Sequence, residues 1–167
     1  MENCEILTKR LVLKKPSPVD AETLFLELDN WEVAKWITRL PDPYTLFEAE
    51  SWVDVISHMD LNFNIFLHDT LIGGAGLVAT AEGHHELGFW LGKSHWRKGY
   101  ATEAVRALLQ HASINHKDSK VVAGCLQDNA GSLKILQSFG FEIQGEDEVF
   151  CHPQRKTLPR LQLSLTL

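Results

Sequence analysis

The fold of this chain is decided by one stretch, His85-Glu86-Leu87-Gly88-Phe89-Trp90-Leu91-Gly92-Lys93-Ser94-His95-Trp96-Arg97-Lys98-Gly99-Tyr100-Ala101-Thr102-Glu103-Ala104. It contains an apolar run, a short loop and the start of a helix. Apolar residues then recur at spacings of three and four, which places them on one face of a helix. They are Ala101, Ala104, Val105, Leu108, Leu109 and Ala112. The sequence therefore predicts a strand over residues 85–91 that leads into an amphipathic helix.

The loop before this helix has the composition of an anion site. Arg97, Lys98 and Gly99 stand at the helix mouth, and residues 100–102 form the first turn. The first N–H groups of a helix have no partner inside it, and the helix dipole is positive at that end. A glycine lets the backbone approach a bulky phosphate because it has no Cβ. The pattern therefore predicts a phosphate-binding loop.

Composition limits the class of protein. The chain has 167 residues, enough for a single domain with its own core, which we expect to span residues 1–167. Its net charge of -6 argues against broad nucleic-acid or anionic-membrane binding. The three cysteines, Cys4, Cys125 and Cys151, are too far apart to indicate a metal site or a disulfide framework, so a reducing cytoplasm is expected. The start is unlike a signal peptide, and no apolar run approaches the roughly 20 residues of a membrane span.

Local patterns predict the other elements. Strands are expected at residues 6–14, 63–67, 71–78, 120–126, 141–150 and 158–167, with residues 120–126 buried on both faces. Helices are expected after the capping residues Ser17, either Asp29 or Asn30, and Thr45, and again over residues 128–139. Gly140 then stands where a left-handed residue ends a helix. This order of elements predicts an α/β fold, a mixed sheet with helices on both faces.

Three stretches match, in order, the motifs of one family. Leu7–Lys14 is similar to its first strand, and residues 86–91 with 96–104 look like its acetyl-CoA motif. Residues 129–133 with 139–141 look like its next helix motif. The whole chain thus resembles the GCN5-related N-acetyltransferase (GNAT) superfamily, most of all the ribosomal-protein N-terminal acetyltransferase (RimJ/RimL-like) branch. The wider superfamily usually has Gln or Arg where Trp96 stands, so one possible side-chain hydrogen bond to the anion is lost.

The resemblance implies a site for acetyl-CoA. In such a fold the sheet is mostly antiparallel, and the strands expected at 85–91 and 120–126 form a splayed parallel pair, the first of them bulged. The acetyl-pantetheine arm lies in the wedge, where Phe89, Trp90 and Leu91 offer backbone groups. The pyrophosphate is wrapped by six consecutive residues, Arg97, Lys98, Gly99, Tyr100, Ala101 and Thr102. Asn129 reaches the arm with its amide, and Ser132 lies one turn later on the same face.

The resemblance also implies the reaction. Acetyl passes from acetyl-CoA directly to a primary amine, on a protein N-terminus or a small molecule, with no covalent acetyl-enzyme and no metal. The amine must lose a proton, and Glu86 is the candidate base, directly or through a water. Ser132 is the candidate acid for the leaving thiolate. Glu103 is assumed to point away from the phosphates, and a homodimer would be in keeping with the family.

Each candidate also has a purely structural interpretation. Glu86 can be a solvent-facing strand carboxylate, Ser132 a first-turn residue and Asn129 only a helix cap, with Arg97 and Lys98 a solvated pair. Alternative functions are a catalytically silent acyl-CoA-binding sensor or interaction module, and an unrelated nucleotide-binding domain. The acceptor pocket is expected between the helices of residues 18–59 and the last hairpin. Five side chains are candidates to line it, namely Trp31, Trp36, Trp52, Phe150 and His152.

Three further patterns are set aside. Residues 88–94 imitate a nucleotide-binding P-loop but have three residues between the glycines where four are needed. Residues 74–79 imitate a dinucleotide fingerprint, yet they lie within an expected strand with no helix behind it. His84 and His85 are adjacent, so on a strand they point to opposite faces and make a poor metal pair.

Overall fold

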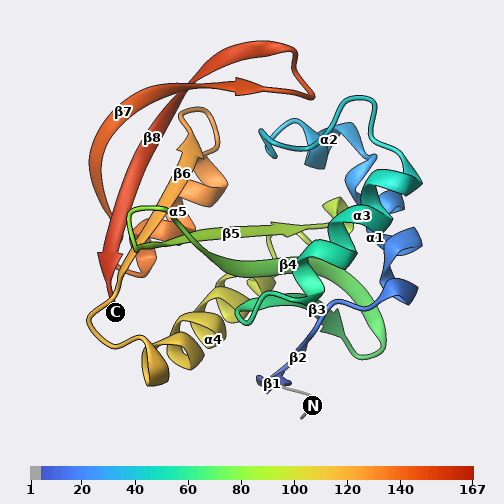
Figure 1. Ribbon diagram of the computed structural model, residues 1–167, viewed down its shortest axis with the longest axis horizontal. Helices are drawn as coiled ribbons and strands as arrows, with labels where there is room; N and C mark the ends of the chain where they lie inside the picture. Colours follow the sequence, from blue (N-terminus) through green and yellow to red (C-terminus); the bar gives the residue numbers. More distant parts are fainter. Residues whose placement is uncertain (1–4) are drawn as a thin grey trace.

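Eight strands form one sheet in the order β1-β2-β3-β4-β5-β6-β8-β7 (Figure 1). The structure, a computed structural model, describes residues 5–167, so Cys4 lies outside the described residues. The strands are β1 Ile6–Leu7, β2 Leu11–Lys14, β3 Asn62–Leu67, β4 Thr70–Ala79, β5 His85–Leu91, β6 Lys120–Leu126, β7 Glu142–Cys151 and β8 Lys156–Thr166. Within the described residues only β5 and β6 run parallel, and the other neighbouring pairs are antiparallel.

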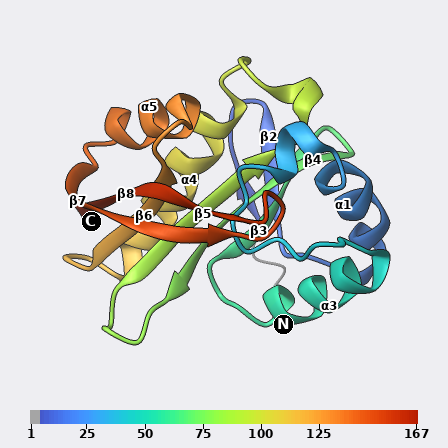
Figure 2. The same ribbon diagram turned by 90° about the horizontal axis from the view of Figure 1, so that it is seen from above.

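Helices cover both faces of this sheet, as expected for the α/β architecture. They are η1 Pro18–Asp20, α1 Ala21–Leu28, α2 Trp31–Ala34, α3 Leu46–Ser57, η2 Lys93–His95, α4 Tyr100–Asn115 and α5 Ala130–Ser138. Figure 2 shows α4 and α5 on one face, with α1 and α3 on the other. None of the helices in residues 5–167 combines the length and apolar character that crossing a bilayer requires.

Two apolar clusters, one on each face, decide which way the side chains of β5 point. The larger cluster joins Leu87 and Leu91 to α4 and has Phe89 packed against it. The smaller cluster is built by α1, α2 and α3 and has Trp90 packed against it. Because successive strand residues point to opposite faces, Glu86 shares the α1–α3 face with Trp90. The candidate base therefore lies on the opposite face of the sheet from α4.

Short-range capping signals form as the sequence predicts. The side-chain oxygens of Asn30 and Thr45 accept backbone N–H groups at the starts of α2 and α3. Gly140 has a left-handed φ of 87° after α5. The Phe141 N–H then donates to the Leu136 carbonyl at 3.2 Å, which satisfies a carbonyl that the helix end leaves free. These residues fix where the helices begin and end.

The expected strand over residues 6–14 is instead a hairpin. Ile6 pairs with Leu13 and Leu7 with Val12, so the chain reverses at residues 8–10. The Thr8 hydroxyl closes this turn by accepting the Leu11 N–H at 2.9 Å. The apolar alternation runs through both arms and does not mark the turn, which is why the sequence predicted one strand.

Strand β6 is buried along one face, and on its other face burial is confined to Leu126, so the expected burial on both faces holds only in part. Val121, Ala123 and Cys125 are buried, whereas Val122 is half-buried and Gly124 is exposed. The exposed face of β6 is the one that Glu86 shares, because Glu86 pairs with Val122. Small and aliphatic residues on both faces made the two faces indistinguishable in the sequence.

The glycines of β4 serve close packing, in line with the rejection of a dinucleotide motif. A Cβ at Gly74 would come within 2.7 Å of the indole nitrogen of Trp90. A Cβ at Gly76 would come within 2.0 Å of the Asn62 amide oxygen. The bare backbone of β4 therefore makes room for an indole and an amide on the α1–α3 face.

Strand β7 is the free edge of the sheet and is strongly acidic. It carries Glu142, Glu146, Asp147 and Glu148. Among the described residues, only Asp147 of these four has a cationic partner, the Arg160 guanidinium of β8, whose Nε donates to it at 2.8 Å. That hydrogen bond lowers the pKa of Asp147 to about 2, so the carboxylate is charged at neutral pH.

Candidate active site

The parallel strands β5 and β6 separate soon after they meet. Their pairing is confined to His85 with Val121 and Glu86 with Val122. Strand β5 continues to Leu91, while β6 follows β8 until Leu126 pairs with Arg160. The two strands therefore form a wedge with Glu86 at its apex, and the splayed parallel pair expected from the sequence is confirmed.

The expected bulge in β5 is wrong. The ladder between β4 and β5 runs without a register shift from Ala79–His85 to Gly73–Leu91. A register shift occurs instead between Ile65 and Phe66, in the ladder of β3 and β4. The wedge thus arises because β6 follows β8 away from β5, without an inserted residue in β5.

One edge of β5 is open toward the wedge. The Gly92 N–H donates to the Ile72 carbonyl at 2.9 Å. Since backbone groups alternate along an antiparallel ladder, Phe89 and Leu91 direct their N–H and C=O groups to the wedge. Trp90 directs its own to β4, where its carbonyl lies against Gly73. Of the three residues expected to offer backbone groups, Trp90 is therefore committed to the sheet.

Trp96 fixes the loop that follows β5. Its indole Nε1 donates to the Leu91 carbonyl at 2.8 Å. The Lys93 ammonium lies 4.2 Å from the centre of the ring. Trp96 therefore donates its side-chain hydrogen bond to the end of β5 and not to an anion. The Leu91 carbonyl is in turn occupied by Trp96 and is no longer free for a ligand.

The loop at the mouth of α4 presents unpaired donors. Arg97 and Gly99 both have left-handed backbones, with φ of 60° and 80°. The first bond of the helix runs from the Glu103 N–H to the Gly99 carbonyl at 3.0 Å. The N–H groups of residues 100–102 precede that bond and have no partner inside the helix. A non-glycine residue held left-handed costs on the order of 1 kcal/mol, so the turn at Arg97 is imposed by its surroundings.

The cations of the loop differ in their contacts. Lys98 turns its ammonium back onto the Ser94 carbonyl at 2.8 Å. Arg97 is exposed. Gly99 is exposed as well, and a Cβ there would meet only the Arg10 guanidinium, at 3.4 Å. Arg97, the helix N–H groups and the bare backbone at Gly99 are together suited to a phosphate.

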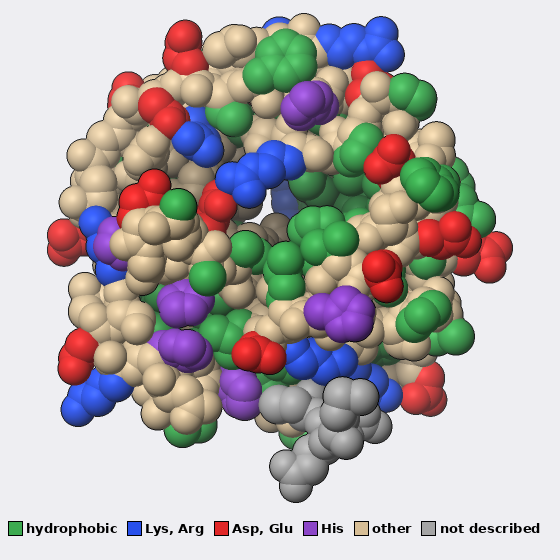
Figure 3. Space-filling view, viewed as in Figure 1, with side chains coloured by type: hydrophobic (Ala, Val, Ile, Leu, Met, Phe, Trp, Pro, Cys, Tyr) green, Lys and Arg blue, Asp and Glu red, His purple; other side chains and the backbone are tan. Residues whose placement is uncertain are grey.

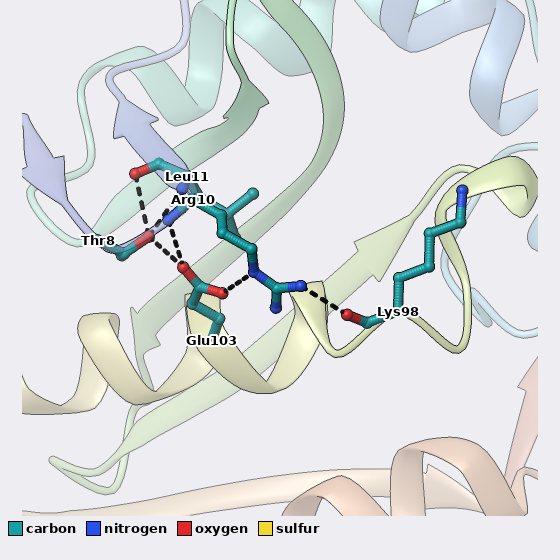
Figure 4. Close-up of polar contacts among 5 residues, drawn as sticks. All are labelled: Thr8, Arg10, Leu11, Lys98 and Glu103. Carbon is teal, nitrogen blue, oxygen red and sulfur yellow. Dashed lines mark hydrogen bonds and ion pairs between the residues drawn. The ribbon is translucent and has the colours of Figure 1, made fainter.

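Glu103 is held by the N-terminal hairpin, whose Thr8 and Arg10 contact its carboxylate (Figure 4). One carboxylate oxygen accepts the Thr8 hydroxyl at 2.7 Å and the Arg10 N–H at 2.8 Å. The other accepts the Arg10 Nε at 2.7 Å. The Arg10 Nη1 also donates to the Lys98 carbonyl at 3.0 Å, and its guanidinium lies 4.6 Å from the centre of the Tyr100 ring.

These contacts keep the carboxylate charged. Partial burial of Glu103 favours the neutral acid, but the hydrogen bonds from Thr8 and Arg10 outweigh it and hold the pKa of Glu103 below its usual range. Arg10 therefore joins three parts of the anion loop, namely Glu103, Lys98 and Tyr100. The sequence analysis gave Arg10 no role, although the residue stands within the stretch that resembles the family's first strand.

Residues 35–42, which we call the strap, close the wide end of the wedge. The backbone N–H of His152 donates to the Thr38 carbonyl at 3.0 Å, and Gln154 Nε2 donates to the Lys35 carbonyl at 2.8 Å. Arg155 forms an ion pair with Asp42. Figure 1 shows the tip of the β7–β8 hairpin reaching over to this segment, and Figure 3 shows the same face hollowed near its centre.

Glu86 is ion-paired across this opening. Arg39 of the strap places its Nη2 at 3.1 and 3.0 Å from the two carboxylate oxygens of Glu86. The Glu86 side chain is 31% exposed and that of Arg39 is 74% exposed. The candidate base is therefore a half-buried carboxylate with an exposed cation as its partner.

Asn129 and Ser132 lie together at the start of α5. The Asn129 side-chain oxygen accepts the Ser132 N–H at 3.1 Å, and its amide NH₂ makes no hydrogen bond within residues 5–167. Ser132 is half-buried. Within the described residues, no hydrogen bond joins the Ser132 hydroxyl to another group. The cap interpretation of Asn129 thus holds, and it is compatible with a ligand contact through the NH₂ group.

Comparison with known proteins settles the family. The model of the acetyltransferase (GNAT) domain matches residues 10–142. The chain belongs to the GNAT acetyltransferases. N-acetyltransferase p20 of Bacillus licheniformis is 29% identical over 150 residues, which cover 84% of this chain and 83% of the relative. The ribosomal-protein-serine acetyltransferase of Escherichia coli is 31% identical over 85 residues, or 50% of this chain and 48% of that protein.

Solved structures share the GNAT fold. An acetyltransferase of this family from Bacillus anthracis has a TM-score of 0.84 at 21% identity, covering 98% of both chains. The microcin C7 self-immunity acetyltransferase MccE, solved with acetyl-CoA and AMP, has a TM-score of 0.77 at 17% identity, covering 96% of this chain and 94% of that one. The fold expected from the sequence is therefore confirmed.

Two cavities lie near elements of the candidate site. One of about 550 Å³ lies between the N-terminal hairpin and the first turns of α4, lined by Leu7, Thr8, Lys9, Gly99, Thr102, Glu103, Arg106, Ala107 and Gln110. One of about 150 Å³ lies between the strap, the end of β6 and the last hairpin, lined by Lys35, Trp36, Leu126, Gln127, Asp128, Gln154, Lys156, Leu158 and Pro159. Of the five side chains expected at the acceptor pocket, Trp36 is in this lining.

The remaining titratable groups are explained by packing. The ring centres of His85 and His116 are 4.8 Å apart. The pKa of His85 is lowered mainly by burial and, to a smaller extent, by the charge of His116. Burial raises the pKa of Cys125 to about 11, so this thiol is neutral and a poor nucleophile at pH 7. Within residues 5–167, no three His, Cys, Asp or Glu side chains form a group that could hold a metal ion.

Replacing Glu103 should make the protein less stable in a pH-dependent way. A carboxylate with a lowered folded-state pKa contributes stability above its ordinary pKa of 4.5, and that stability is lost as pH falls through the folded-state pKa. We expect Glu103→Gln to lower the free energy of unfolding by roughly 1–3 kcal/mol at pH 7. The difference should shrink as pH falls below 4.5, as measured by urea unfolding. Glu48→Gln, in the first turn of α3, is the control, and an equal loss for Glu103→Gln at all pH values would contradict the argument.

Proposed function

We propose that this GNAT protein transfers the acetyl group of acetyl-CoA directly to a primary amine. The observation that carries the proposal is the wedge between β5 and β6, with a carboxylate at its apex and the anion loop of α4 beside its open edge. We further propose that residues 1–167 work as one catalytic domain in the cytoplasm, with neither nucleic acid nor a membrane as partner. A homodimer is part of the same proposal.

The residues present fit acetyl-CoA as the cosubstrate, which supplies an activated thioester. The pyrophosphate would lie on the N–H groups of Tyr100, Ala101 and Thr102, with Arg97, Lys98 and Gly99 around it. Two or three such bonds to a charged group contribute about 1.5–3 kcal/mol each. The open edge of β5 can pair with the amides of the pantetheine arm through both backbone groups of Phe89 and the N–H of Leu91. Support also comes from MccE, a structural neighbour solved with acetyl-CoA.

The two candidate catalytic residues have complementary tasks. The amine nitrogen bonds to the acetyl carbon while the carbon–sulfur bond breaks. Glu86, at the apex, takes the proton that the amine must lose, directly or through a water. Ser132, at the mouth of α5, gives a proton to the leaving thiolate or holds it by a hydrogen bond. No covalent acetyl-enzyme and no metal enter this scheme.

The acceptor we favour is a protein or peptide N-terminus, with small amines as the other class. A lysine-type amine of pKa near 10.4 costs about 4–5 kcal/mol to deprotonate at pH 7, whereas an α-amine near 7.8 costs about 1 kcal/mol. A half-buried carboxylate such as Glu86 is a sufficient base for the α-amine. The E. coli relative named as a ribosomal-protein-serine acetyltransferase supports the same choice.

Acetyl-CoA should bind saturably, and Arg97 should contribute to the affinity. Arg97→Gln is expected to weaken binding about two- to tenfold, because one exposed cation beside the pyrophosphate is removed. Calorimetric titration measures this, with ATP and NAD as control ligands. Lys117→Gln removes the same charge just beyond the far end of α4 and should leave binding unchanged. Absence of acetyl-CoA binding by folded protein would overturn the cosubstrate assignment.

Replacing Glu86 should reduce turnover in a manner that depends on the acceptor. For Glu86→Gln we expect kcat to fall roughly a hundredfold or more near pH 7, because the amine loses its proton acceptor. The loss should be smaller at pH 9 for an α-amine acceptor, most of which is then neutral. Thiol release across pH 6–9 is the measurement. Full activity of the variant over that range would remove Glu86 from the mechanism.

Replacing Ser132 should slow the departure of the thiolate. We expect Ser132→Ala to lower kcat about tenfold or more and to leave the Kd of acetyl-CoA within about twofold. Ser138→Ala, at the other end of α5, is the matched control and should behave like the unmodified protein. An unchanged maximal rate for Ser132→Ala would show that Ser132 has no catalytic role and is only a first-turn residue of α5.

A further inference from the structure

The carboxylate of Glu86 is already occupied by a cation. The Arg39 Nη2 lies 3.1 and 3.0 Å from its two oxygens. An acceptor amine that gives its proton to Glu86 must approach the same two oxygens, directly or through a water. The guanidinium and the acceptor amine therefore compete for one place.

The partner of Glu86 is held in a way that permits exchange. The Arg39 side chain is 74% exposed, and the contacts described for it use one of its three nitrogens. An exposed ion pair of this kind shifts an equilibrium by at most about fivefold. The free energy needed to displace Arg39 is therefore small compared with the binding free energy of a whole acceptor.

The other cation near Glu86 is committed elsewhere. Arg160 of β8 is close enough to Glu86 to feel its charge, but its Nε and Nη2 both donate to Asp147, at 2.8 and 2.5 Å. Its side chain is 23% exposed, so it is far less free to move than Arg39. Of these two arginines, Arg39 is therefore the one that an acceptor amine can replace at Glu86.

The strap allows Arg39 to move without opening the wedge. Thr38 is anchored by the His152 N–H, and Asp42 is ion-paired with Arg155. Lys35 is held through its carbonyl by Gln154. The backbone of the strap is therefore fixed on both sides of Arg39 by the β7–β8 hairpin. The side chain of Arg39 can leave Glu86 while the strap stays in place.

We propose that Arg39 occupies the acceptor-amine subsite of the free protein, and that the acceptor displaces its guanidinium from Glu86 on binding. Arg39 is then a specificity-determining residue, because it sets a threshold that favours a positively charged primary amine over neutral nucleophiles. The proposal rests on the proposed function, since it concerns the acceptor of that reaction. It adds that the guanidinium of Arg39 competes with the acceptor amine for Glu86.

The test is steady-state kinetics on Arg39→Gln at saturating acetyl-CoA. The probe amines are a short peptide with a free serine N-terminus and 1,4-diaminobutane, and the one that the unmodified protein turns over faster is used. We expect KM for the amine to fall about two- to fivefold, with kcat retained within about twofold and KM for acetyl-CoA unchanged. Such a split between KM and kcat would not follow from general destabilisation.

The matched control is Lys117→Gln. It removes one exposed cation just beyond the far end of α4, with the same change in charge, and it lies outside the strap. KM for the amine should be unchanged in this variant. An unchanged or raised KM in Arg39→Gln, or an equal fall in Lys117→Gln, would overturn the assignment of Arg39. Absence of turnover by the unmodified protein with either amine would overturn the proposed function and, with it, this inference.

Discussion

The short pairing of β5 with β6 is the constraint on which the site depends. Two residue pairs join these strands, while seven hold β6 against β8. The sheet therefore directs β6 away from β5 immediately after Glu86. The same divergence creates the open edge at Phe89 and Leu91 and leaves a carboxylate at the apex. A longer parallel ladder would satisfy those backbone groups within the sheet and leave no place for an extended ligand.

A second constraint ties the start of the chain to its centre. Thr8 and Arg10 are 95 and 93 residues away from Glu103, and their hydrogen bonds to its carboxylate join the N-terminal hairpin to the first turn of α4. A negative charge near a helix N-terminus is favourable for the helix but unfavourable for a bound phosphate. The hairpin eases this conflict, because Arg10 pairs with the carboxylate and reduces its net charge. The proposed anion loop thus depends on a segment that lies far from it in the sequence.

What the sequence predicted correctly is mostly local in the chain. The face of α4, the caps at Asn30 and Thr45 and the left-handed Gly140 each depend on residues within a few positions of one another. The mixed sheet followed from the order of elements. The family followed from three short motifs, which were matched as wholes without any knowledge of what each residue contacts.

What the sequence did not predict depends on residues far apart. The Arg39–Glu86 pair spans 47 positions, and Gln154 reaches Lys35 across 119. No periodicity or cap signal encodes such contacts. The turn inside residues 6–14 was hidden because both arms alternate alike. The bulge predicted for β5 came from resemblance alone, and the continuous ladder with β4 shows that register in this chain is set by the neighbouring strands.

The acidic edge of the sheet has a consequence for the molecule in a crowded solution. An unpaired strand edge is a template on which another extended chain can add. On β7 a second copy laid edge to edge would bring rows of carboxylates together, and Asp147 is the one among them neutralised by β8. Like charges directly opposite one another oppose pairing. Pairing of two copies through β7 is therefore disfavoured by charge.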